Sequence, residues 1–205
     1  MTNTIISADD ALQRLIDGNE RFRRGRTRFP TTQKEIRARL AHGQAPYATI
    51  LGCSDSRVPP ELIFDAGLGE LFVVRVAGNV YSPEVSGSLQ YAGAHLNTSL
   101  FVVMGHADCG AVKAALDTKL HAVQQRSRIQ ILVDDILPGL RALDPQSPPS
   151  VQLERAVEAN VRWTMRQILD SPEGKVALAE GRKRLIGGIF DIASGRVRFL
   201  NQARD

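Results

Sequence analysis

Short apolar runs that alternate with helical patterns constrain this chain more than any other feature of its sequence. Four nearly continuous apolar runs are typical of strands buried on both faces, because such strands lose the polar alternation of half-exposed ones. They are YATILGC (47–53), ELFVVRVAG (70–78), SLFVVMGH (99–106) and KRLIGGIFDI (183–192). A further segment, GRVRFL (195–200), is expected to return as an edge strand after the Ser194–Gly195 turn.

Helical patterns fill the intervals between these runs. We expect helices over residues 8–24, 83–96, 110–122, 127–142, 150–170 and 173–181, with a further short helix that stops at Gly43. Ser7, followed by Asp10, is the expected cap of the first helix. Buried strands separated by helices predict parallel βαβ units. The fold class is therefore α/β, with a mostly parallel sheet of about four strands plus an edge strand, flanked by helices.

The chain has the size and composition of one globular domain. It has 205 residues, of which 43% are hydrophobic and 23% are charged, and its formal net charge is +4. The first residues lack the basic start and apolar stretch of a secretory signal, and no apolar run approaches the ~20 residues of a membrane span. We therefore expect a single domain over residues 1–205, located in the cytoplasm. There its two cysteines would stay thiols or bind a metal.

Two of the predicted strands end at residues that can bind a metal. Cys53 ends one apolar run, and His106 and Cys109 form an H-x-x-C pair where another run gives way to a helix. Ligands of open α/β sheets bind at the carboxyl ends of the strands, so these side chains are candidates for one shared site. Two cysteines and one histidine are a ligand set of catalytic zinc sites, which keep a fourth position open. Water or Asp55 could take that position.

Asp55 and Arg57 follow Cys53 on one face of an extended segment, because residues two apart share a face. A carboxylate beside a guanidinium stays ionised, and the bidentate pair has a fixed geometry. Asp55 therefore has two competing partners, the metal and Arg57. If Asp55 binds the metal, the site is closed. If it pairs with Arg57, a water can occupy the metal.

Each of these features also has a simpler interpretation. A single cysteine at a buried strand end is commonly a small apolar residue, and an isolated H-x-x-C pair often arises by chance. The Asp55–Arg57 pair could be a surface ion pair that contributes ~0–1 kcal/mol. The arginine-rich segment RFRRGRTRF could bind nucleic-acid phosphates, but it also suits a helix end, and no base-reading module accompanies it. A redox role is weaker, because the cysteines do not form a C-x-x-C pair.

The segment CSDSRVPPELIFDAGLGELFVVRVAGNV, followed by GSLQYAGAHL and VVMGHADCGAVKAAL, resembles the β-class carbonic anhydrases. The resemblance is continuous from about Gln44 to Leu116. It resumes more weakly at ANVRWTMRQILDSP and at GGIFDIASGRVRFL. The C-S-D-S-R and H-x-x-C-G signatures at this separation are highly specific for that family.

The resemblance implies the β-carbonic anhydrase fold and a reaction. The reaction is zinc-dependent, reversible hydration of carbon dioxide to bicarbonate and a proton by zinc-bound hydroxide. Cys53, His106 and Cys109 match the family's ligands for one Zn²⁺ per subunit. Asp55 and Arg57 match its Asp–Arg dyad, and Asp55 is also a possible fourth ligand in a closed state.

The resemblance further implies a substrate pocket and an oligomer. Gln44 matches a glutamine that hydrogen-bonds the substrate across the dimer interface. Phe72 and Tyr91 match aromatic positions of the pocket, and Gly110 matches a glycine whose amide faces the ligand. A homodimer or a dimer-based higher oligomer is expected, with a helical arm of residues 1–45 used in dimerisation. Neither nucleic acid nor a membrane is an expected partner.

Two other functions stay open on the same residues. One is a hydrolase of carbon disulfide or a similar heterocumulene, which only access to the pocket would separate from a hydratase. The sequence shows no extension that would form a tunnel. The other is a non-catalytic zinc-binding module with Asp55 permanently on the metal. Such a module would need neither Gln44 nor Arg57.

One departure from the family concerns regulation. A branch of the family that binds bicarbonate at a second, inhibitory site carries a tryptophan at the position of Ile50. This chain keeps the arginine of that site, Arg75, without the tryptophan. We therefore do not expect that form of regulation.

Overall fold

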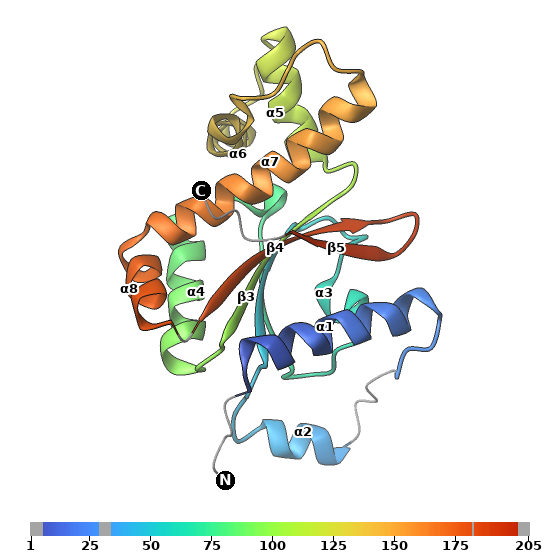
Figure 1. Cartoon of the computed structure of the whole chain (residues 1–205), viewed down its shortest axis with the longest axis vertical. Helices are drawn as coiled ribbons and strands as arrows, with labels where there is room; N and C mark the ends of the chain where they lie inside the picture. Colours follow the sequence, from blue (N-terminus) through green and yellow to red (C-terminus); the bar gives the residue numbers. More distant parts are fainter. Residues whose placement is uncertain (1–5, 29–33, 182, 201–205) are drawn as a thin grey trace.

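The computed structural model describes residues 6–28, 34–181 and 183–200, and the five strands in these segments form one sheet (Figure 1). The strands are β1 (Ala48–Gly52), β2 (Leu71–Arg75), β3 (Leu100–His106), β4 (Arg184–Asp191) and β5 (Arg196–Leu200). Their order is β2-β1-β3-β4-β5, with β5 antiparallel to β4 and all other pairs parallel. The predicted α/β fold, with its mostly parallel sheet and an edge strand after the Ser194–Gly195 turn, is confirmed.

Helices lie in the predicted intervals, and one further short helix, Pro60–Ile63, was not predicted. They are α1 (Ala8–Arg23), α2 (Lys34–Leu40), α3 (Pro60–Ile63), α4 (Pro83–His95), α5 (Gly110–His121), α6 (Arg128–Ile136), α7 (Pro149–Asp170) and α8 (Pro172–Glu180), with the 3-10 turns η1 (Ala77–Asn79) and η2 (Leu137–Leu140). The helix expected over 127–142 is shorter, since α6 gives way to η2 where Pro138 has no N–H to donate to the preceding turn. Within the described segments, no helix combines the length and the apolar character needed to cross a membrane.

Helices cover both faces of the sheet (Figure 1). Helix α1 contacts β1, β3 and β5 on one face, and α7 lies across the other face against β3 and β4. All five residues of β1 are buried. The contact with α7 is close, because a Cβ on Gly105 would come within 2.7 Å of Val161. Packing from both sides fixes where β1 and β3 end, and the candidate site lies at those ends.

Helix α1 packs on its own chain. Ser7 caps its first turn and accepts a backbone N–H at 3.1 Å, as the sequence predicted. Asn19, which is 5% exposed, donates to the carbonyl oxygens of Ile63 and Gly195. The inner face of α1 is therefore covered within the chain. The use of residues 1–45 as a dimerisation arm stays a prediction, and residues 1–5 and 29–33 of that arm lie outside the described residues.

The arginine cluster between Arg21 and Arg28 forms ion pairs within the chain. Arg21 Nε lies 2.5 Å from one carboxylate oxygen of Asp65, and the Arg28 amide donates to the other at 2.9 Å. Two further arginines of the cluster pair with Glu20. Asp65 is only 2% exposed, and a buried carboxylate needs such partners. The bonds of Arg21 and Arg28 to Asp65 therefore hold the end of α1 against the loop that follows α3.

Candidate metal centre

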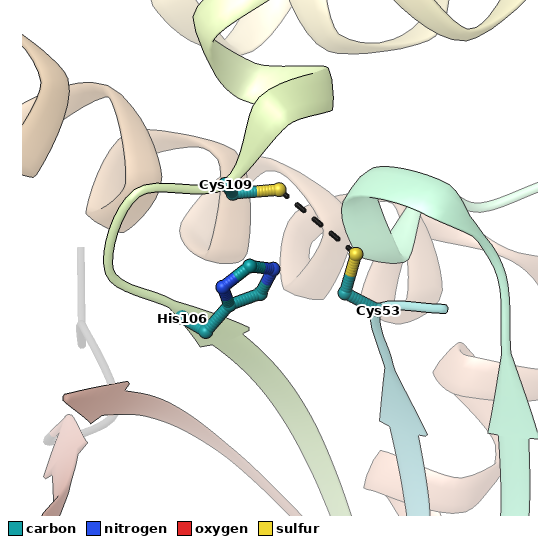
Figure 2. A group of neighbouring side chains, drawn as sticks. All are labelled: Cys53, His106 and Cys109. Carbon is teal, nitrogen blue, oxygen red and sulfur yellow. Dashed lines mark hydrogen bonds between the residues drawn. The ribbon is translucent and has the colours of Figure 1, made fainter. Parts of the chain in front are cut away.

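Cys53, His106 and Cys109 meet at the carboxyl edge of the sheet. Cys53 directly follows β1, His106 is the last residue of the neighbouring strand β3, and Cys109 directly precedes α5. One ligand atom from each lies within 4.8 Å of the others, and all three residues are buried. Figure 2 shows both sulfur atoms and one ring nitrogen turned toward the same space. The structure thus brings together the three residues that the strand ends indicated.

His106 presents one unpaired nitrogen to this group. Its Nδ1 lies 2.9 Å from the carbonyl oxygen of Ala107, so a neutral ring carries its proton there and donates it to that oxygen. Nε2 is buried and has no hydrogen-bond partner among the described residues. Leaving a buried acceptor unsatisfied costs about 1–3 kcal/mol. A metal ion would satisfy it, and an Nδ1–H bonded to a carbonyl is how metal-binding histidines are oriented.

The two cysteines can share one proton. Their sulfur atoms lie 3.9 Å apart. A hydrogen bond from the Cys109 thiol lowers the pKa of Cys53, and the same contact, together with burial, raises the pKa of Cys109. A second thiolate therefore needs a nearby cation. Divalent metals displace such protons on binding, and a donor set of two thiolates and one imidazole suits zinc.

Asp55 lies beside this group and is held by Arg57. Arg57 Nε and Nη2 donate to the two carboxylate oxygens at 2.9 and 2.7 Å, and the Arg57 amide donates at 3.0 Å. Asp55 Oδ2 is 3.9 Å from His106 Nε2. The Arg57 guanidinium keeps the pKa of Asp55 well below its usual range, so the carboxylate is ionised. Asp55 thus pairs with Arg57, one of the two partners that the sequence left open for it.

Arg75, at the end of β2, holds the same loop. Its Nε donates to the carbonyl oxygen of Cys53 at 2.9 Å, and its Nη2 donates to that of Asp55 at 2.6 Å. The sequence associated Arg75 only with a regulatory bicarbonate site and did not predict these two bonds. Ile50, where that site would need a tryptophan, is fully buried in β1.

Gly110 is the predicted substrate residue that lies at the site. It is the first residue of α5, directly after Cys109. A Cβ at this position would have no heavy atom within 4 Å. Helix N-termini attract negative charge, because their first amide groups lack partners within the helix. The start of α5 therefore offers open space and backbone donors next to the metal-binding group.

The other three predicted substrate residues lie away from the metal-binding group of their own chain. Gln44 is four residues ahead of β1, whereas Cys53 follows the opposite end of this five-residue strand. A strand of that length spans about 16 Å. Phe72 pairs in register with Thr49, near the start of β1, and its ring contacts Tyr91 with centroids 6.1 Å apart. Tyr91 itself is 47% exposed.

One contact to Cys53 was missed from the sequence. The backbone amide of Gly78, in η1, donates to Cys53 Sγ at 3.4 Å. Gly78 and Asn79 both have positive φ, of 70° and 46°. The Gly-Asn pair after β2 was the available signal, since these residues adopt that conformation most readily.

Comparisons with known proteins agree on one family. A family model described as carbonic anhydrase matches residues 48–197. Carbonic anhydrase 2 of Mycobacterium tuberculosis is 40% identical over 190 residues, which cover 91% of this chain and 89% of that protein. The solved beta-carbonic anhydrase CcaA is 29% identical, with a TM-score of 0.74 and coverage of 93% and 95%. A chain from the two tetrameric beta-carbonic anhydrases of Sordaria macrospora is 25% identical, with a TM-score of 0.72 and coverage of 94% and 98%.

Proposed function

The chain belongs to the β-class carbonic anhydrases, enzymes that interconvert carbon dioxide and bicarbonate, and we propose that its activity depends on zinc held by Cys53, His106 and Cys109. The observation that carries the proposal is the buried group itself. It combines two sulfur atoms and an unpaired imidazole nitrogen within 4.8 Å, beside a carboxylate that Arg57 keeps ionised. This donor set fits zinc and leaves a fourth position for water.

Zinc, when bound, supplies a Lewis acid that makes water nucleophilic near neutral pH. Asp55 would accept a hydrogen bond from that water and so orient its lone pair toward the carbon of carbon dioxide. Three hydrogen bonds from Arg57 hold the carboxylate in one orientation. Such pre-orientation increases the reaction rate, because the reacting groups need not be ordered during the reaction. Arg57 is thus a positioning residue for Asp55.

The start of α5 would bind the product. Negative charge develops on the oxygen atoms of carbon dioxide as it becomes bicarbonate. Amide groups in the first turn of α5, at Gly110, can stabilise this charge because they are fixed before the reaction begins. The open space at Gly110 leaves room for a small substrate.

Gln44, Phe72 and Tyr91 are assigned to the site of a second copy. Gln44 precedes β1, and Phe72 and the Tyr91 ring that it contacts lie near the start of β1, at the end opposite Cys53. Strand β2 is at the edge of the sheet, where unpaired backbone groups favour association, and Tyr91 is exposed beside it. A homodimer, with residues 1–45 as an additional contact, would complete each site. The similarity to the tetrameric Sordaria macrospora enzymes supports a dimer-based assembly.

Metal content and activity of matched variants test the proposal. Zinc bound per chain and carbon dioxide hydration would be measured for the wild type, His106→Ala and Cys109→Ser. We expect both variants to lose zinc and activity together. Zinc retained at the wild-type ratio in both variants would show that these residues are not the ligands.

A further inference from the structure

The backbone of η1 lies against the sulfur atom of Cys53. The Gly78 amide donates to Cys53 Sγ at 3.4 Å, and the Val76 amide donates to the carbonyl oxygen of Gly52 at 3.1 Å. A hydrogen bond to a thiolate is charge-assisted and withdraws electron density that the sulfur would otherwise give to a metal. The position of the Gly78 amide therefore affects how Cys53 would bind zinc, in addition to the backbone amide of Asp55, which also faces Cys53.

The Gly78 amide is not held by a long regular element. Turn η1 has three residues, and Gly78 has φ 70°, in the left-handed region. A Cβ on Gly78 would come within 2.8 Å of Ile136 and 3.1 Å of Ala111, so the backbone packs tightly against α5 and α6. A turn this short needs contacts from outside to keep a single orientation.

Helix α7 supplies such contacts through two side chains one turn apart. Asn160 Nδ2 donates to the carbonyl oxygen of Gly78 at 2.8 Å, and Thr164 Oγ1 donates to that of Asn79 at 3.2 Å. Residues four apart lie on the same face of a helix. Asn160 is 1% exposed and Thr164 is fully buried. Two consecutive carbonyl groups of η1 are thus held by one 22-residue helix.

Both side chains interrupt an apolar helix face. Their neighbours Ala156, Val161 and Met165 are buried. An amide or a hydroxyl buried there destabilises the fold unless it is hydrogen-bonded. Asn160 Oδ1 has no partner in the part of the chain that the structure describes, so the bond to Gly78 is what compensates for burying this residue.

We infer that Asn160 and Thr164 are positioning residues for the metal centre, which hold η1 so that the Gly78 amide points at the Cys53 sulfur. The inference rests on the proposed zinc site and extends it to α7. A residue that serves packing alone affects only stability. A positioning residue also affects the electron density on the sulfur, and therefore the bond between Cys53 and the metal.

The cobalt(II)-loaded full-length protein provides the test, because its sulfur-to-cobalt charge-transfer absorption reports the electron density on the thiolates. Asn160→Leu and Thr164→Val remove a donor with little change in volume, and Thr164→Ser keeps the hydroxyl. We expect the absorption of the first two variants to shift to longer wavelength. Their zinc affinity should nevertheless fall by about 10–100-fold, the usual effect of losing a partner behind a metal ligand, because Cys53 Sγ is no longer held in one orientation and this loss outweighs its higher electron density. Thr164→Ser should retain the wild-type absorption and affinity. If Asn160→Leu does not fold, the comparison of Thr164→Val with Thr164→Ser still tests the inference.

Trp163→Phe is the matched control. Trp163 lies on the same helix, and its Nε1 donates at 2.9 Å to the carbonyl oxygen of Asp135 in α6, so this variant removes a donor of α7 without removing a hydrogen bond to η1. This variant should keep the wild-type absorption and zinc affinity even if it is less stable. The inference is overturned if Asn160→Leu and Thr164→Val behave as Trp163→Phe does. If the wild type itself shows no sulfur-to-cobalt absorption, the proposed zinc site fails as well.

Discussion

Arg57 donates three hydrogen bonds to the Asp55 carboxylate, two from its guanidinium and one from its backbone amide. The pair is two residues apart, and its carboxylate still reaches to 3.9 Å from His106 Nε2. Asp55 is therefore ionised, fixed in orientation and close to the candidate metal position. This arrangement is the basis of the proposal that the fourth zinc position is open to water.

Removing the guanidinium should reduce catalysis without unfolding the protein. In Arg57→Gln, Asp55 loses its orientation and its pKa returns toward the usual value. We expect kcat/KM for carbon dioxide hydration, measured by stopped flow, to fall by about 10–100-fold. Arg162→Gln is the control, because Arg162 Nε and Nη2 donate to Glu158 at 2.9 and 2.7 Å and this ion pair includes no residue of the candidate metal centre. An equal loss in both variants would contradict a specific role for Arg57.

Hybrid dimers can show whether Gln44 serves the partner's site. In a hybrid of one Gln44→Ala chain and one Cys53→Ser chain, the only intact metal centre would receive its glutamine from the neighbouring chain. We expect such hybrids, isolated with two different affinity tags, to recover about half of the wild-type activity, since one of two symmetric sites is complete. Activity no higher than half that of the Gln44→Ala homodimer would place Gln44 in its own chain's site.

Acid should remove the contribution of Glu158 to stability. Burial alone would raise the pKa of Glu158, but hydrogen bonds from Arg162 and Arg198 outweigh it and lower the pKa. The stabilisation is therefore present above the ordinary glutamate pKa of ~4.3 and is lost as the pH falls through the lower folded-state value.

The measurement is the free energy of unfolding of the wild type and of Glu158→Gln at several pH values. We expect the variant to be less stable by about 0.5–1 kcal/mol at pH 7, since partly exposed ion pairs contribute little. This difference should shrink as the pH falls below 5. A difference that stays constant with pH would show that the ion pairs are not its cause.

Two helical glycines should respond in opposite directions to alanine. A Cβ on Gly18 in α1 would lie 1.9 Å from the carbonyl oxygen of Phe64, so α1 must shift to accommodate it. Gly18→Ala should lower the free energy of unfolding by about 1–3 kcal/mol. A Cβ on Gly87 in α4 has nothing within 4 Å, and Gly87→Ala should raise stability by about 0.5–1 kcal/mol. Thermal denaturation of both variants checks the pair, and equal destabilisation would contradict the close contact of α1 with α3.

The sheet and the metal-binding group could be predicted because each depends on local patterns. Buried parallel strands are continuous apolar runs, and the carboxyl ends of parallel neighbours meet at one edge. That geometry brings Cys53 together with His106 even though the sequence separates them by 53 positions. The short helix α3 and the 3-10 turn η1 were missed because four and three residues are too few to show a helical period.

The contacts that hold the site could not be predicted in the same way. Arg75 and Asn160 donate to backbone carbonyl oxygens 22 and 82 positions away. Every residue has such a carbonyl group, so the sequence does not indicate which one is the partner. The sequence did contain one signal for Asn160, because it is a polar residue within the apolar face of a long helix. Such a residue is buried only if it has a partner. That rule indicates that a contact exists but does not name the partner.

Carbon dioxide hydration by the zinc-loaded protein, followed by stopped flow from neutral to mildly alkaline pH, is the most direct test of the account. We predict substantial activity already at neutral pH, which chelation should remove and added zinc should restore. The reason is that Asp55 pairs with Arg57, so that water can occupy the fourth position of the metal. Activity that begins only on the alkaline side would mean that Asp55 closes the site at neutral pH. No hydration at any pH, with zinc confirmed in the protein, would contradict the proposed function, and carbon disulfide would then be the substrate to test.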